Sequence, residues 1–137
     1  MHQKITITAT INAPIEKVWK YWSEPDHITK WAFASDDWEA PSAENDLRVG
    51  GRFVTHMQAK DSSTEFDFSG EYTEVIENEK ISYLLDDERK VVTVFESTGN
   101  QTTIISTFEM EHENPEDMQR AGWQAILDNF KKHVEQE

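Results

Sequence analysis

Apolar and polar residues alternate at the beginning of the chain, where Ile5, Ile7, Ala9 and Ile11 are separated by single threonines. A period of two residues places successive side chains on opposite faces of a strand, so this stretch predicts a strand with one buried face. Later stretches repeat the pattern and are joined by short turns, which predicts consecutive antiparallel strands. Their predicted inward residues are Phe53, Thr55 and Met57; Phe66, Phe68, Gly70 and Tyr72; Ile81, Tyr83 and Leu85; Val91, Thr93 and Phe95; and Ile104, Ser106, Phe108 and Met110.

Apolar residues at spacings of three and four predict helices in two other parts of the chain. After Pro14, a short amphipathic helix is expected to run as far as Pro25, and residues 26–31 are expected to form a second. Beyond Pro115, the chain carries a long apolar stripe. The stripe consists of Met118, Trp123, Ala125, Ile126, Leu127, Phe130 and Val134. This final helix would be about 30 Å long, which is enough to cross a sheet.

The stretch Ala32–Asp46 is acidic and follows neither period, so it is predicted to be a loop or flap. The pair Gly50-Gly51 that follows predicts a bulge or a sharp bend in a curved sheet. A strand, two short helices, several strands and one long helix together predict an α+β fold. In this fold, a curved antiparallel sheet wraps around the C-terminal helix.

Composition adds limits on partners and location. The 137 residues suit one domain spanning 1–137, and 13 basic against 27 acidic residues give a formal net charge of −14. Such a surface repels phosphate backbones and anionic headgroups, so nucleic acid is not an expected partner. The first residues lack the apolar run of a signal peptide, and no stretch is apolar enough to span a membrane. We therefore expect a soluble, cytoplasmic protein without membrane insertion.

Residues for metal, cofactor or nucleophilic chemistry are not gathered in any motif. The chain has no cysteine, and its five histidines are scattered without metal-ligand spacing, so neither a metal nor a cofactor is expected. These histidines are His2, His27, His56, His112 and His133. Alternation turns His56, Asp67 and Glu71 away from the inward face, although a bulge at Gly70 would turn Glu71 inward.

The inward aromatic side chains suggest a cavity, because ligand pockets are mostly apolar with a few polar groups. The candidate ligand-binding residues are Phe53, Met57, Phe66, Phe68, Tyr72, Tyr83, Phe95, Phe108, Met110, Met118 and Trp123. The candidate polar groups are Tyr72, Tyr83, Thr93 and Ser106, and the candidate entrance residues are Trp22, Trp31, Phe33, Trp38 and Gly122. The alternative is that these residues form a packed core. Gly122 would then mark a close approach of the helix to the sheet, rather than a thinned wall at a cavity entrance.

Several short motifs carry a resemblance to a known family over almost the entire chain. They are Ala13-Pro14 with Val18-Trp19, then Trp31, the run Val49-Gly50-Gly51-Arg52-Phe53, Gly70-Glu71-Tyr72 with Val75 and Ile76, and Gly122-Trp123 with Leu127. In their order and spacing, they resemble the START-like (SRPBCC) superfamily. Within that superfamily they resemble the homologues of the heat-shock-protein-90 ATPase activator. The resemblance implies a helix-grip fold that often encloses a cavity.

The same resemblance implies no single chemistry, because relatives include carriers of lipids and other hydrophobic ligands, polyketide cyclases and co-chaperone domains. Our first hypothesis is non-catalytic binding of a small hydrophobic or aromatic ligand, such as a lipid, polyketide or flavonoid-like metabolite, with a role in stress response. The second is a co-chaperone-like activator whose partner is a heat-shock chaperone. The third is a cyclase or hydrolase that acts in the same cavity, which needs a titratable group there. No residue is assigned a catalytic role.

Overall fold

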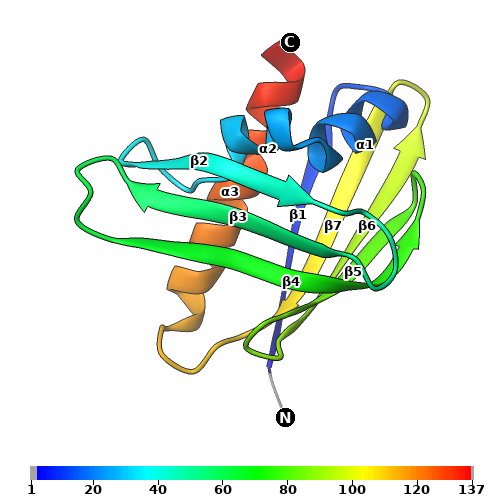
Figure 1. Cartoon of the computed structure of the whole chain (residues 1–137). Coiled ribbons are helices and arrows are strands. Elements are labelled where there is room, and N and C mark those ends of the chain that lie inside the picture. Colours follow the sequence, from blue (N-terminus) through cyan, green and yellow to red (C-terminus); the bar gives the residue numbers. More distant parts are fainter. Residues whose placement is uncertain (1–2, 137) are drawn as a thin grey trace.

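Residues 3–136 are described in a computed structural model, in which a curved seven-stranded antiparallel sheet packs against a long C-terminal helix (Figure 1). The strand order is β1-β7-β6-β5-β4-β3-β2. The elements are β1 (Lys4–Ile11), α1 (Ile15–Ser23), α2 (Pro25–Trp31), β2 (Trp38–Asn45), β3 (Arg52–Ala59), β4 (Glu65–Ile76), β5 (Lys80–Leu85), β6 (Lys90–Thr98), β7 (Gln101–Glu109) and α3 (Glu116–Gln136). The predicted α+β helix-grip fold is confirmed.

The inward rows of the strands follow the predicted alternation. On β3, β5 and β7 every second residue is buried, and on β6 this holds as far as Phe95; these rows face the concave side of the sheet where α3 lies. Strand β4 departs from this pattern near its start, because the inward residue Phe66 is 49% exposed, whereas Tyr72 further along the strand is buried. The sheet therefore has a closed half around Tyr72 and a more open half around Phe66.

The prediction of a loop or flap over Ala32–Asp46 is wrong for most of its length, because β2 lies there and pairs with β3. β2 is an edge strand, and its pairing shifts register between Glu39 and Ser42, on either side of Pro41. Proline and charged residues are tolerated on an edge strand, where one row of backbone groups needs no partner. The sequence of β2 therefore lacks the apolar alternation that revealed the other strands.

Gly50 and Gly51 form the sharp bend between β2 and β3. Gly50 has φ +84°, a left-handed conformation that favours glycine. A Cβ on Gly51 would lie 2.1 Å from the carbonyl oxygen of Asp46, so no larger residue fits. Both glycines also bond to the backbone of Tyr72, at 2.9 Å each, which fixes the turn against β4. The sheet's irregular pairings lie elsewhere, within β2 and after Tyr72 in β4.

Helix α3 packs its apolar stripe against the sheet and against the two short helices. Phe130 is fully buried, and its ring lies edge-on against Trp22 and Trp31, with centroid distances of 5.0 and 4.9 Å. Nearer the start of the helix, Trp123 stacks on Phe108 of β7 at 4.0 Å. These aromatic contacts hold α3 across the concave face at two separate levels.

The outer edge of β1 is bonded by side chains of α3. Arg120, Gln124 and Lys131 donate hydrogen bonds of 3.0, 3.1 and 2.7 Å to the carbonyl oxygens of the three alternate threonines of β1. Glu135 accepts a further bond of 2.8 Å from the backbone N–H of Asn12. An open strand edge offers unpaired backbone groups to other chains, and here the helix occupies them.

Candidate functional site

An apolar cavity of about 370 Å³ lies between α3 and the concave face of the sheet. Eight of the candidate ligand-binding residues line it: Phe53, Met57, Phe66, Phe68, Tyr72, Tyr83, Met118 and Trp123. Three of the candidate entrance residues do so as well: Trp22, Trp31 and Gly122. The structure thus brings most of the predicted set around one space. That these residues bind a ligand stays a prediction.

Three candidate ligand-binding residues do not line the cavity, although they face inward. Phe95 is covered by two tryptophans of α1, with ring centroids at 5.3 and 5.6 Å. Phe108 is fully buried beneath the stacked ring of Trp123. Met110 follows the end of β7 and is half-buried against the core. Alternation therefore identified the correct face of each strand but not which side chains are covered by a second layer.

Two candidate entrance residues lie beside the cavity rather than on its wall. Trp38 packs edge-on against Phe66, with ring centroids 5.8 Å apart, and only Phe66 of the two lines the cavity. Phe33 is half-buried beyond the end of α2, where Asn129 of α3 donates a 3.1 Å bond to the carbonyl oxygen of Trp31.

The cavity opens to solvent between β4 and the first half of α3. Phe66 and Met118 both line it, and they are 49% and 60% exposed. Gly122 lies on the same stretch of helix, and a Cβ built on it would meet no atom within 4 Å. The close approach proposed as one reason for this glycine is therefore wrong. The space beside it supports the alternative of a thinned wall.

Tyr72 supplies a polar group that already has a partner. Its hydroxyl donates to the side-chain oxygen of Asn45, whose amide in turn donates a 2.6 Å bond to the carbonyl oxygen of Ser23. Burial raises the pKa of Tyr72 well above its ordinary value, so the hydroxyl keeps its proton at neutral pH. Of the other predicted polar groups, Ser106 lines the cavity and bonds to Thr93, which lies behind it, at 3.0 Å.

Tyr83 differs from Tyr72 because its hydroxyl makes no hydrogen bond within residues 3–136. The residue is 9% exposed and lines the cavity. Within these residues, the hydroxyl of Ser23 is the one side-chain polar atom that is both fully enclosed and without a hydrogen bond. The Tyr83 hydroxyl also lacks a bond, so it cannot be fully enclosed and must border open space. Burial raises the pKa of Tyr83, and the nearby Arg89 offsets only part of that rise. The cavity thus contains a protonated, unbonded phenol.

Sequence reasoning missed the polar end of the cavity, which Arg89, Glu111, Asn114 and Gln119 line. Gln119 is buried and bonds to the backbone N–H and carbonyl of Glu111 and to the carbonyl of Asn114, at 3.0, 3.2 and 2.7 Å. Gln119 gave no signal in the sequence that it lines the cavity, because it is a single polar residue beside the apolar stripe of α3. Arg89 could have been found, because it continues the inward alternation of Val91 by one step.

A cyclase or hydrolase would need a titratable carboxylate or histidine in the cavity, and Glu111 is the one such group among its described lining residues. Glu111 is half-buried and accepts a hydrogen bond from Asn114. The alternation that turned Glu71 away from the inward face is confirmed, and the bulge at Gly70 that would have turned it inward is absent. Gly70 pairs in register with both neighbouring strands, and Glu71 is exposed.

The residues from 12 to 135 match the family model described as Activator of Hsp90 ATPase homolog 1-like protein. The chain belongs to this family. Among solved structures, an AHSA1-like protein from Aeromonas hydrophila is 46% identical with a TM-score of 0.92, covering 98% of this chain and 93% of its own. A protein from Cytophaga hutchinsonii is 52% identical with a TM-score of 0.84, covering 97% and 92%. No curated protein matches the chain.

Membership of the Activator of Hsp90 ATPase homolog 1-like family agrees with the architecture and leaves the ligand open. The fold extends to distant proteins, such as one from Nitrosomonas europaea at 20% identity, a TM-score of 0.80 and coverage of 97% and 94%. No helix within residues 3–136 is both long and apolar enough to cross a membrane. In the same range, no three acidic or histidine side chains are placed to hold a metal ion. His2 lies outside the described residues.

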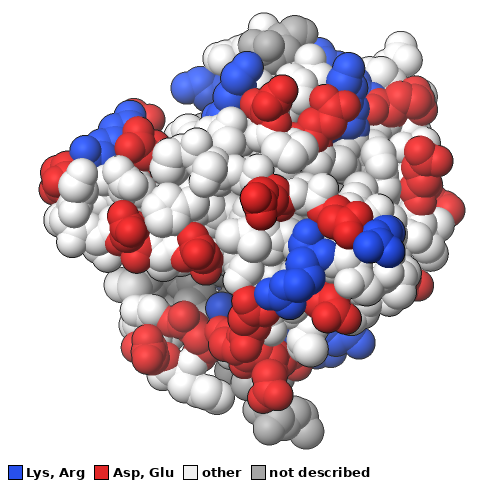
Figure 2. Space-filling view, viewed as in Figure 1, with Lys and Arg blue, Asp and Glu red and all other residues white. Residues whose placement is uncertain are grey.

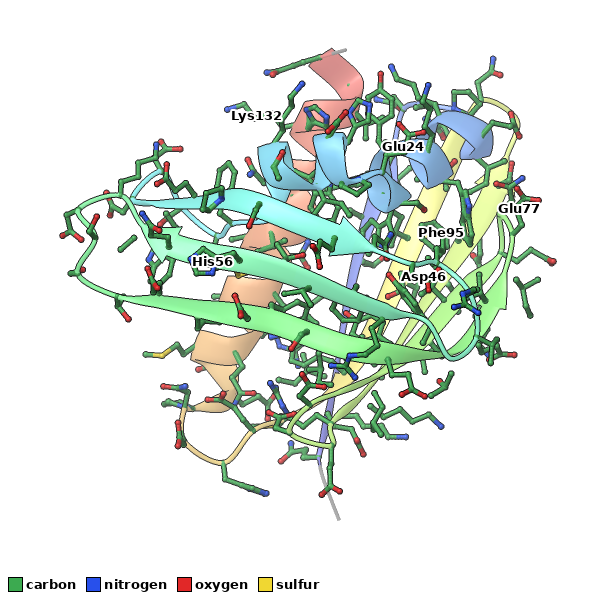
Figure 3. The ribbon with its side chains drawn as sticks, in the orientation of Figure 1. Glu24, Asp46, His56, Glu77, Phe95 and Lys132 are labelled. Atoms are coloured by element: carbon green, nitrogen blue, oxygen red, sulfur yellow. The ribbon has the colours of Figure 1, made fainter. Side chains whose placement is uncertain are left out.

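His56 of this family member lies on the outward face of β3, away from α3, as the alternation predicted (Figure 3). Its Nδ1 lies 2.7 Å from Oδ1 of Asp67, and its Nε2 lies 3.8 Å from Glu65. The hydrogen bond to Asp67 raises the pKa of His56 above its ordinary value, and the charge of Glu65 adds to this, although partial burial opposes both. The pair is a cross-strand surface interaction outside the cavity.

Replacing Asp67 with asparagine is expected to lower the pKa of His56. Because the folded-state pKa is raised, the protonated pair stabilises the fold below the ordinary histidine pKa, and this contribution is lost as pH rises through the raised value. The thermal stability difference between wild type and Asp67→Asn should therefore shrink across that window. NMR titration of the imidazole protons checks the pKa, with Glu77→Gln at the far end of the sheet as a control of equal charge change (Figure 3). An unchanged His56 pKa in Asp67→Asn would contradict the assignment.

Proposed function

We propose that the chain binds a small hydrophobic or aromatic molecule in the cavity between α3 and the sheet. The observation that supports this is an open, aromatic-walled space inside a fold whose surrounding core is closely packed. Natural ligand pockets range from about 300 to 1,000 Å³, so a cavity of about 370 Å³ suits a small ligand. Burial of apolar surface would provide most of the affinity, at about 25 cal/mol per Å² before the costs of association.

The wall and the mouth of the cavity are suited to a ligand with flat rings. Phe53 lies close to three other rings that line the cavity, those of Phe68, Tyr72 and Tyr83, with centroid distances of 5.7, 5.3 and 4.8 Å. An aromatic ligand among these rings would gain contact beyond simple area burial. The exposed Phe66 and Met118 at the mouth offer a path from solvent, and methionine adapts its shape to different ligands.

Titration with 2-ethylnaphthalene tests the proposal with an apolar probe. We expect saturable quenching or enhancement of tryptophan fluorescence, because Trp22, Trp31 and Trp123 line the cavity. In amide NMR spectra, shifts should be largest at inward residues of β3, β4 and β5. The amides of Glu77 and Asn78, which lie in the turn between β4 and β5 and do not line the cavity, serve as the internal control and should not shift. Shifts confined to the surface, or no saturable response, would contradict the proposal.

Activation of a heat-shock ATPase is a second candidate, and family membership is the observation that favours it. The test is to measure the ATPase rate of the cognate chaperone with and without this chain. A higher rate with the chain present would support this candidate. Stimulation that persists in a variant with a blocked cavity would make the activator role independent of ligand binding. No stimulation at saturating concentration would remove this candidate.

A further inference from the structure

The polar end of the cavity contains a cation with unused hydrogen-bonding capacity. Arg89 directly precedes β6, and its side chain is 13% exposed. Its Nε donates a 2.7 Å bond to Asp87, and Nη1 makes a long 3.4 Å contact with the carbonyl oxygen of Glu109. Its Nη2 has no bond within the part of the chain that the structure describes. Because guanidinium N–H groups can only donate, this end of Arg89 calls for an acceptor.

Tyr83, whose hydroxyl is unbonded, lies on the strand next to Arg89. Tyr83 on β5 is directly opposite Val91 on β6, and Arg89 lies two residues before Val91 on the same face. Arg89 is close enough for its charge to lower the pKa of Tyr83, although burial still keeps the phenol protonated. Both groups border the same cavity, and both offer a proton. Neither donor atom is fully enclosed, so solvent can reach both in the free protein. A ligand that displaces this solvent would have to supply an acceptor in its place, because a donor left without one would be costly.

We infer that Tyr83 and Arg89 together bind one oxygen acceptor of the ligand, and that this oxygen belongs to an uncharged group such as a ketone. This inference rests on the proposed function and assigns the polar contact within it. The rest of the ligand lies against the aromatic wall, with its polar end directed toward the start of β6. Tyr72 plays no equal part, because its hydroxyl proton already bonds to Asn45.

Local charge favours a ketone over a carboxylate at this position. Asp87 already neutralises Arg89, and Glu111 also lines the cavity. A carboxylate ligand would add a second unbalanced negative charge in a partly desolvated site, where like charges repel more strongly than in water. The whole chain carries a net charge of −14, and Figure 2 shows acidic side chains in excess over basic ones on the visible face. An anion would therefore enter against both the local and the overall field.

Three probes of one ring system and similar size test the inference: 2-ethylnaphthalene, 2-acetylnaphthalene and 2-naphthoate. We expect the ketone to bind wild type about tenfold more tightly than the hydrocarbon, as one or two hydrogen bonds would give, and 2-naphthoate to bind more weakly than the ketone. In Tyr83→Phe the preference for the ketone should fall to within about threefold, while affinity for 2-ethylnaphthalene is kept. Tyr21→Phe, which changes a tyrosine of α1 that does not line the cavity, is the matched control and should retain the preference.

The outcomes separate this inference from the proposed function. If no probe binds wild type, the proposed function fails, and the inference fails with it. If ketone and hydrocarbon bind equally, or if Tyr83→Phe retains the full preference, ligand binding stands and the polar contact is refuted. Tighter binding of 2-naphthoate would overturn the choice of an uncharged group. The wild-type series decides these points even if a variant misfolds. Tyr83→Phe should fold normally because the hydroxyl makes no hydrogen bond within residues 3–136.

Discussion

Gly122→Phe is expected to abolish binding of 2-ethylnaphthalene, with at least a hundredfold loss of affinity, and to leave the fold intact. Gly122 lines the cavity near its mouth, and a Cβ there would meet no atom within 4 Å. A phenyl ring carried on that Cβ is therefore expected to extend into the space that a ligand would occupy. Since glycine is among the poorest helix formers, the exchange should not cost helix stability. Calorimetric titration measures the affinity, and urea unfolding measures the stability.

Gly122→Ala is the matched control for this experiment. A methyl group is too small to close the mouth, so ligand affinity should stay within about threefold of wild type. The free energy of unfolding should rise by about 0.5–1 kcal/mol, because alanine restricts the unfolded chain and favours the helix. If Gly122→Phe bound the probe as tightly as wild type does, the ligand would have to occupy a different place. If Gly122→Ala were destabilised, the empty space beside the helix would be in doubt.

Phe130→Ala is expected to reduce the free energy of unfolding by about 3–5 kcal/mol. Phe130 is fully buried on α3, and its ring contacts Trp22 and Trp31 of the two short helices. Removing it leaves a void where rings of all three helices pack together in the core. Such a loss is a large part of the 5–15 kcal/mol that usually stabilises a domain. Urea unfolding monitored by circular dichroism gives the value.

Met118→Ala controls for the loss of an apolar side chain from the same helix. Met118 is 60% exposed, so its truncation should change the free energy of unfolding by no more than about 0.5 kcal/mol. A loss in Phe130→Ala no greater than in this control would mean that the three helices do not depend on the ring. Both variants keep the polar end of the cavity unchanged, so a difference between them reports packing.

The strands that the sequence predicted correctly are those buried on one face. Alternation in β3, for example, places Phe53 and Met57 inward and His56 outward, and burial alone selects that register. β2 escaped prediction because an edge strand buries little and tolerates Pro41. Its place is fixed by pairing with β3, which a local pattern does not contain. Local periodicity thus reveals elements that are stabilised by their own buried face.

The cavity wall was more predictable than its boundaries. An inward position is a property of one strand, whereas contact with the cavity depends on what other elements cover. Phe95 and Phe108 face inward, but α1 and Trp123 lie over them. Arg89 was missed because it lies one residue before β6, outside the apolar run that marked the strand. Both cases depend on how separate elements pack against one another, which the spacing of residues along the chain does not specify.

The pairing of β1 with β7 has a consequence for how the molecule is assembled. Strands β2 to β7 each pair with a neighbour in sequence, but Thr6 and Thr107, whose hydroxyls meet across β1 and β7, are 101 positions apart. The entropy of closing so long a loop is lost before this pairing gives any contact in return. Ile7 of β1 is part of the cavity wall. The cavity wall is therefore complete only in molecules in which β1 has already paired with β7.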